Sequence, residues 1–111
     1  MAVVNQYKFV GIDNNTSGSA LAPFGSGNPL VSETYLIKSL LVTSAGTPTV
    51  TVINNSITAI KSKALTANET TELLTQPLIV EGGKTFTVQS STADSFDIAI
   101  SYLNIKKEVT N

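Results

Sequence analysis

Apolar and polar residues alternate along several short stretches of the chain, and this period of two predicts β-strands. The alternation is clear in residues 49–53, 85–90 and 96–102, and a further strand is predicted at residues 34–43. A half-buried strand turns its apolar side chains toward the core on one face of a sheet. We therefore expect one wall of the core to consist of Phe86, Val88, Phe96, Ile98, Ile100 and Tyr102.

Other strands are predicted where the alternation is weaker, at residues 3–12, 57–65, 71–75 and 78–80. Within residues 57–65, Lys61 and Lys63 are expected to face water, as lysines do on an edge strand. An alternative for residues 68–74 is one helical turn with Asn68 as its N-cap.

Glycine and small polar residues mark the turns between these stretches. Gly82 and Gly83 supply the positive φ that a hairpin turn needs, so residues 78–80 and 85–90 are predicted to pair. A polar turn at 91–95 would lead into the next strand. The last residues, 106–111, are charged and are expected to be loose.

Residues 34–43 are apolar on both sides of the predicted strand. Strict alternation would place Tyr35, Ile37 and Leu41 on one face, and Leu36, Leu40 and Val42 on the other. A strand with two apolar faces is either central in the protein or covered by a partner.

Residues 13–33 form a long segment without periodicity, and such loops are uncommon in a compact domain. Two interpretations are open: an ordered surface loop, or an arm that docks on a partner subunit. The strand at 3–12 is a second candidate docking segment, since it could add to a neighbouring subunit. The apolar residues that could anchor the loop are Leu21, Pro23, Phe24 and Leu30.

The predicted strands number seven to eight and recur roughly every 8–12 residues, with no long helix. This spacing is typical of an all-β antiparallel β-sandwich or jelly roll. A chain of 111 residues has the size of one domain. We expect a single β-sandwich domain over residues 1–111, with a loop or arm at 13–33 and a short flexible tail at 106–111.

Only 14% of the residues are charged, whereas threonine, serine and asparagine make up about a third, which favours strands and turns. The net charge is −1 and every basic residue is lysine, so nucleic-acid binding is not expected. No stretch approaches the roughly 20 apolar residues of a membrane span, and residues 1–6 do not have the pattern of a signal peptide. A soluble protein is expected. The N-x-[ST] sequences, interpreted as chance matches, are at Asn14, Asn15, Asn54 and Asn68.

The chain contains no histidine, cysteine or tryptophan. This composition excludes a serine–histidine–aspartate triad, a cysteine nucleophile and a thiolate metal site. Two pairs of carboxylates, Glu69 with Glu72 and Asp94 with Asp97, have residue types that glycoside hydrolysis or calcium binding uses. We interpret both pairs as solvated charges in turns.

Two further motifs have a structural explanation. The oxygen-rich residues 13–16, with Gly18, are interpreted as turn caps rather than calcium ligands. Gly82-Gly83-Lys84 does not have the spacing of a phosphate-binding loop, and no helix is predicted after it. We therefore expect no enzymatic activity, no cofactor and no metal site.

Three stretches carry a resemblance to a known group of proteins: residues 67–74 (ANETTELL), 78–89 (LIVEGGKTFTVQ) and 97–105 (DIAISYLNI). They resemble small structural proteins of tailed bacteriophages, especially those of marine and cyanobacterial phages. In that group A-N-x-T-x-E-L-L precedes L-x-L-E-x-G-D-x-L-x-V, and the chain ends near D-V-x-L-S-Y-L-E-I. This chain departs from the pattern at Gly83-Lys84, where the group often has G-D. The resemblance implies a non-enzymatic virion component with a sandwich or jelly-roll fold.

The first functional hypothesis is a capsid decoration (cement) protein that bridges major capsid subunits, located in the virion and assembled in the host cytoplasm. The expected partners are the major capsid protein, other virion proteins and further copies of the chain, but neither nucleic acid nor membrane. One alternative is a structural component of the tail, neck or fibre attachment. Another is a carbohydrate-binding sandwich, for which the aromatic residues, mostly expected in the core, are Tyr7, Phe9, Phe24, Tyr35, Phe86, Phe96 and Tyr102.

Overall fold

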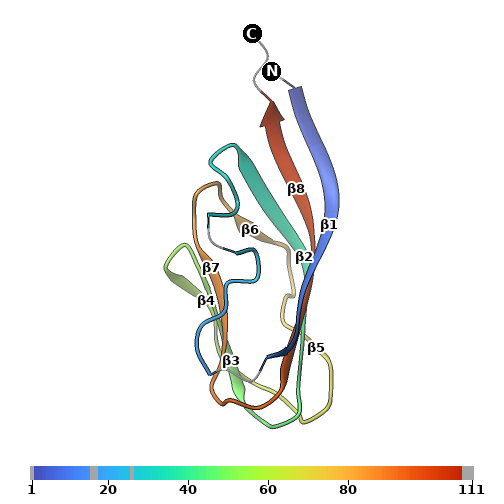
Figure 1. The fold of residues 1–111 in the computed structure, drawn as a ribbon, viewed down its shortest axis with the longest axis vertical. Coiled ribbons are helices and arrows are strands. Elements are labelled where there is room, and N and C mark those ends of the chain that lie inside the picture. Colours follow the sequence, from blue (N-terminus) through green and yellow to red (C-terminus); the bar gives the residue numbers. More distant parts are fainter. Residues whose placement is uncertain (1, 16–17, 26, 109–111) are drawn as a thin grey trace.

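Two antiparallel β-sheets lie face to face around a hydrophobic core (Figure 1). The computed structural model describes residues 2–15, 18–25 and 27–108, with side chains described for 5–13, 18–25 and 27–106. The larger sheet contains β1 (Ala2–Asn15), β2 (Glu33–Ser44), β5 (Thr71–Glu72), β6 (Leu78–Val80) and β8 (Phe96–Glu108). The smaller sheet contains β3 (Thr49–Asn54), β4 (Ile57–Ala64) and β7 (Phe86–Ser90).

The order of the strands is that of a jelly roll. In the larger sheet β8 lies between β1 and β2, and both β5 and β6 pair with the other edge of β2. In the smaller sheet β3 lies between β4 and β7, and Leu21 forms a bridge with Val88 on the free side of β7. Leu21 therefore takes the position of a short strand in the smaller sheet, although in sequence it lies between β1 and β2. The chain thus crosses between the two sheets repeatedly. The predicted all-β antiparallel sandwich or jelly roll is confirmed.

The predicted core residues on β7 and β8 are buried, but they form two facing walls rather than one. Phe86 and Val88 belong to the smaller sheet, whereas the other four belong to β8 in the larger sheet. The predicted hairpin around Gly82 and Gly83 is also wrong, because β6 pairs with β2 and β7 pairs with β3. Gly83 does have the expected positive φ of 77°, but its turn connects the two sheets. Alternation marks a half-buried strand without indicating which sheet it joins.

Strict alternation also gave the wrong faces for the second half of β2. Its pairing with β8 shifts between Ile37 and Ser39, which indicates a β-bulge. Ile37 and Leu40 are both fully buried, three positions apart, so Leu40 faces the core and Leu41 faces outward. One extra residue in a strand reverses the faces of the residues that follow it.

The segment that precedes β2 packs against its own sandwich. Pro23 is buried, and Phe24 lies among Tyr35, Phe86 and Tyr102 with ring centroids 4.8–5.5 Å away. Leu30, expected as an anchor, is instead 51% exposed.

The turn after β6 passes very close to this segment. A Cβ atom on Gly82 would lie 2.5–2.8 Å from the carbonyl oxygens of Leu30, Val31 and Glu33. Only glycine allows this approach without a shift of the backbone.

β1 and β8 extend beyond the smaller sheet at the end of the molecule where β1 begins and β8 ends (Figure 1). The longest dimension is 52 Å, against 22 Å in the other two directions. The tail predicted at 106–111 is corrected in part, since β8 continues to Glu108; residues 109–111 lie outside the described residues.

Other boundaries also differ from the predictions. The strand expected at 71–75 has two residues, and no helix forms at 68–74, where Asn68 has a φ of 58°. The edge strand β4 does expose Lys61 and Lys63 as expected. Among the described residues, no helix is long and apolar enough to cross a membrane.

Candidate assembly surface

The outer face of the larger sheet carries a row of apolar side chains across four strands. Tyr7 on β1 pairs with Leu103 on β8, Leu103 pairs with Leu36 on β2, and Leu36 pairs with Ile79 on β6. Residues paired across strands share one face of a sheet. Tyr7 is 74% exposed and Ile79 is 54% exposed, while Leu36 and Leu103 are partly exposed. Phe9, next to Tyr7 on the same face, is 69% exposed.

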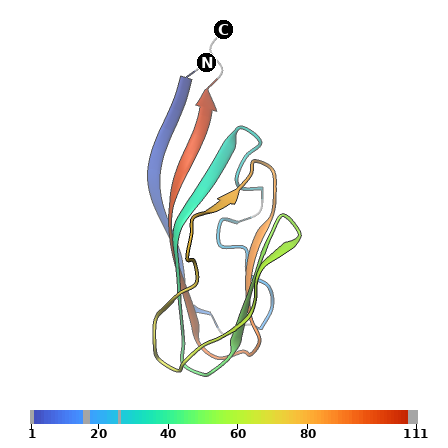
Figure 2. The same ribbon diagram turned by 180° about the vertical axis from the view of Figure 1, so that it is seen from behind.

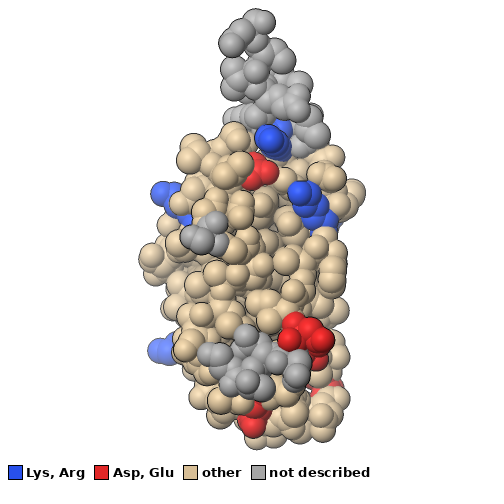
Figure 3. All heavy atoms as spheres, in the orientation of Figure 1, with Lys and Arg blue, Asp and Glu red and all other residues tan. Residues whose placement is uncertain are grey.

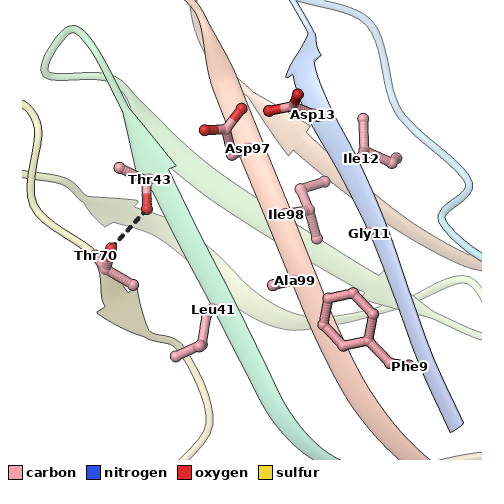
Figure 4. Close-up of a pocket in the computed structure, with 10 residues that line it drawn as sticks. All are labelled: Phe9, Gly11, Ile12, Asp13, Leu41, Thr43, Thr70, Asp97, Ile98 and Ala99. Carbon is pink, nitrogen blue, oxygen red and sulfur yellow. Dashed lines mark hydrogen bonds between the residues drawn. The ribbon is translucent and has the colours of Figure 1, made fainter.

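A depression of about 570 Å³ lies beside this row (Figure 4). Its floor is formed by Gly11 on β1 and Ala99 on β8, which pair with one another, and Ala99 also pairs with Leu41. Small residues on adjacent strands leave a gap that the larger neighbours Phe9 and Leu41 flank. The bulge in β2 is essential for this shape, since it turns Leu41 outward.

Acidic and hydroxyl groups close one end of the depression. Figure 4 shows the side chains of Asp13 and Asp97 close together, beyond Ala99. Across the same end, the hydroxyl groups of Thr43 and Thr70 are 2.8 Å apart and share a hydrogen bond. Beside the apolar row, the ammonium group of Lys38 lies 6.0 Å from the centre of the Tyr7 ring. The outer face therefore carries an apolar row with one ammonium group beside it, and carboxylates at one end of the depression.

The inner face of the sheet ends in a buried polar cluster. Asn104 donates to the Glu33 carboxylate over 2.8 Å, and the backbone N–H of Leu30 donates to the same group over 3.0 Å. Burial raises the pKa of Glu33, but these bonds and the charges of Lys106 and Lys8 together hold it below the ordinary value of 4.5.

The two tyrosines beside this cluster have pKa values shifted in the opposite direction. Burial and the negative charge of Glu33 raise the pKa of Tyr35 to about 12, with a further contribution from Tyr102. Burial and Glu33 also raise the pKa of Tyr102. Both rings are buried and packed 4.7 Å apart, so they act as structural side chains.

The carboxylate pairs found in the sequence have separate positions and structural contacts. Glu72 accepts hydrogen bonds from the Ser39 hydroxyl and the Leu40 backbone N–H, at 2.6 and 2.7 Å. Asp94 accepts one from Thr92 within its own turn. Within the described side chains, no group of three or more acidic residues, histidines or cysteines could hold a metal ion.

The other sequence motifs are also accounted for. Of the oxygen-rich segment at 13–16, only the Asp13 side chain lies within the described residues. Gly82-Gly83-Lys84 lies in the turn between the sheets described above.

The aromatic residues expected in the core are buried or partly buried except Tyr7 and Phe9, which face outward. The sequence did not predict that these two rings face outward. Both faces of β1 carry apolar residues, and the face that packs against the core is the one with Val10 and Ile12.

Comparison with known proteins finds a likeness of fold but no match in sequence. No protein-family model matches it, and no curated protein matches its sequence. One similar solved structure comes from the Bacillus endospore appendages, a family of disulfide-linked pili, with a TM-score of 0.50 and 14% identity over 96% of this chain and 89% of that chain. Another comes from the virus-like particle of the extra small virus of the giant freshwater prawn Macrobrachium rosenbergii, with a TM-score of 0.50 and 10% identity over 99% and 82%. At these identities the likeness concerns the fold alone.

Proposed function

We propose that this chain is a structural component of a virion: a decoration (cement) protein of a tailed bacteriophage that bridges major capsid subunits. The sequence resemblance of residues 67–105 motivates the phage assignment. The jelly-roll fold, shared with a virus-like particle protein and a pilus protein, supports a role in a repeated assembly. The observation that carries the proposal is the outer face of the larger sheet, which exposes a continuous apolar row on a chain with few charges.

The proposed mechanism is the burial of this outer face against the capsid. Exposed apolar rows of this kind mark interaction sites. Their burial is favourable, because each Å² of apolar surface removed from water contributes about 25 cal/mol of free energy. The depression over Gly11 and Ala99 would accept a protruding side chain of a capsid subunit. Asp13 and Asp97 at its end favour a lysine or arginine there. Contacts with two neighbouring capsid subunits would hold them together, as the proposed function requires.

The test uses purified phage particles that have been stripped of the protein and then mixed with the recombinant chain. We expect the chain to bind in hundreds of copies. We also expect a rise in the temperature at which the shells open, because the chain binds only to the closed shell and thereby stabilises it. A count of about six to twelve copies, as in the cyclic rings of a neck or tail, would instead favour the alternative location. Failure to bind particles at all would contradict the virion assignment.

A matched pair of variants tests the docking face. Ala99→Lys fills the floor of the depression, and we expect it to weaken particle binding roughly ten-fold or more. Ala59→Lys makes the same chemical change on the exposed edge strand β4 of the smaller sheet, and should bind as the unchanged chain does. Equal binding by both variants would show that the outer face is not the docking surface.

A further inference from the structure

β1 is a long edge strand, and no other strand lies beyond it within the described residues. It has 14 residues, contains no proline, and pairs with β8 without a register shift from Ala2 to Ile12. One edge of its backbone is therefore bonded to β8, while the other presents donors and acceptors along its length. Such an edge is a template for another strand.

The other edges of the two sheets are protected against strand addition. β4 carries Lys61 and Lys63, and its pairing with β3 shifts register twice. The far edge of the larger sheet is divided into the two short strands β5 and β6. On the free side of β7, Leu21 makes two backbone hydrogen bonds of 2.9 Å with Val88. Charges, short strands and covered edges are the usual protections, and β1 has little of them.

The side chains beside the free edge also indicate that something covers it. Tyr7 and Phe9 are 74% and 69% exposed, although aromatic rings of this size bury roughly 150–250 Å² each when they pack. A strand added to β1 would place the Cβ atoms of its residues about 4.5–5.5 Å from the Cβ atoms of the residues opposite them, so its side chains would cover these rings. The only long unprotected edge that a second copy offers among its described residues is its own β1, so the pairing is isologous and closes as a dimer.

We propose that β1 pairs antiparallel with β1 of a second copy of this chain, with Phe9 facing Phe9 of that copy across the two-fold axis. In this register Tyr7 lies opposite Gly11, whose missing side chain leaves room for the ring, and Lys8 lies opposite Val10. A shift by one pair, with Tyr7 opposite Phe9, would bring Lys8 against Lys8, and like charges directly opposite destabilise a sheet. The dimer joins the two larger sheets edge to edge, so both outer faces point in the same direction. It extends the proposed function by presenting two docking faces at once, but it does not depend on it.

The oligomeric state of the purified chain tests the proposal without any capsid. Sedimentation equilibrium should show a dimer for the unchanged chain. Phe9→Lys places two ammonium groups opposite each other at the axis, and we expect the dissociation constant to rise roughly ten-fold or more. Ile57→Lys changes an equally exposed residue (68%) on β4 and should leave the dimer intact. A monomeric unchanged chain, or equal effects of the two substitutions, would overturn the proposal.

The absence of cysteine from the sequence allows a direct test of the register. A single cysteine forms a symmetric disulfide only where a residue meets itself, since the bridge requires Cβ atoms about 3.5–4.5 Å apart. Under mild oxidation Phe9→Cys should cross-link, whereas Asn5→Cys, exposed on the same strand and face, should not. Faster cross-linking of Asn5→Cys than of Phe9→Cys would overturn the proposed two-fold axis. If the dimer is intact but does not bind particles, the result would contradict the proposed function and leave the proposed dimer unaffected.

Discussion

Glu33 is a buried carboxylate at the start of β2, only 8% exposed, and its charge is stabilised by neighbours from three parts of the chain. Asn104 and the backbone of Leu30 donate to it, and Lys8 and Lys106 lie near enough to favour the ionised form. A buried carboxylate with such partners stabilises the fold only while it is ionised.

We therefore predict a loss of stability in acid that depends on Glu33. Its pKa is lower in the folded chain than the ordinary 4.5, so its contribution is complete above pH 4.5 and is lost as the pH falls through the folded pKa. In Glu33→Gln the free energy of unfolding, measured in urea, should fall less steeply below pH 4.5 than in the unchanged chain. Glu69→Gln, at an exposed position, is the control and should keep the original slope. An identical slope in Glu33→Gln would contradict the prediction.

At the scale of the element, the β-bulge in β2 decides what both faces of the larger sheet present. It keeps Ile37 and Leu40 in the core and turns Leu41 toward the depression. Glu72 on β5 accepts hydrogen bonds from the two residues that follow the bulge, Ser39 and Leu40. The bulge is thus stabilised by a side chain 32 residues further along the chain.

Removal of this acceptor should destabilise the fold. In Glu72→Ala the N–H group of the fully buried Leu40 loses its partner, and an unsatisfied donor costs roughly 1–3 kcal/mol. We expect a loss near 1 kcal/mol, at the low end because Glu72 itself is exposed, measured as a lower urea midpoint. Glu69→Ala, in the same connection, should change it by less than about 0.5 kcal/mol. Equal effects would show that the bulge does not require Glu72.

At the scale of the whole molecule, Phe24 connects the loop before β2 to both sheets. Its ring contacts Tyr35 and Tyr102 on the larger sheet and Phe86 on the smaller one (Figure 2 shows the same loop from behind). Charged side chains are sparse on the face of the molecule that Figure 3 shows, and the ring contacts of Phe24 hold this part of the loop against both sheets.

We predict that Phe24→Ala destabilises the protein and loosens this loop. Complete burial would make the loss about 3–5 kcal/mol, and partial burial lowers the expectation to about 2 kcal/mol. Limited proteolysis within residues 18–32 should become faster at the same time. Val31→Ala, at a position 89% exposed in the same segment, should alter neither. Unchanged cleavage in Phe24→Ala would show that the loop is held by other contacts.

The local pattern was sufficient to predict the strands and much of the core. Phe96, Ile98, Ile100 and Tyr102 alternate because one face of a single strand meets the core, and this property belongs to neighbouring residues alone. The positions of Lys61 and Lys63 predicted an exposed edge strand for the same reason. The all-β class follows from many such short, local signals.

The assembly surface could not be predicted in this way, because it depends on residues far apart in sequence. Gly11, Leu41 and Ala99 become neighbours only through the pairing of β1, β8 and β2, and Leu41 faces outward only because of the bulge. Tyr7 and Phe9 have the pattern of core residues, yet within the part of the chain that the structure describes no second sheet lies over their face. The sequence by itself determined which residues form strands, since alternation is local; only the tertiary structure decided which faces stay exposed, because exposure depends on strand order, register and packing between the sheets.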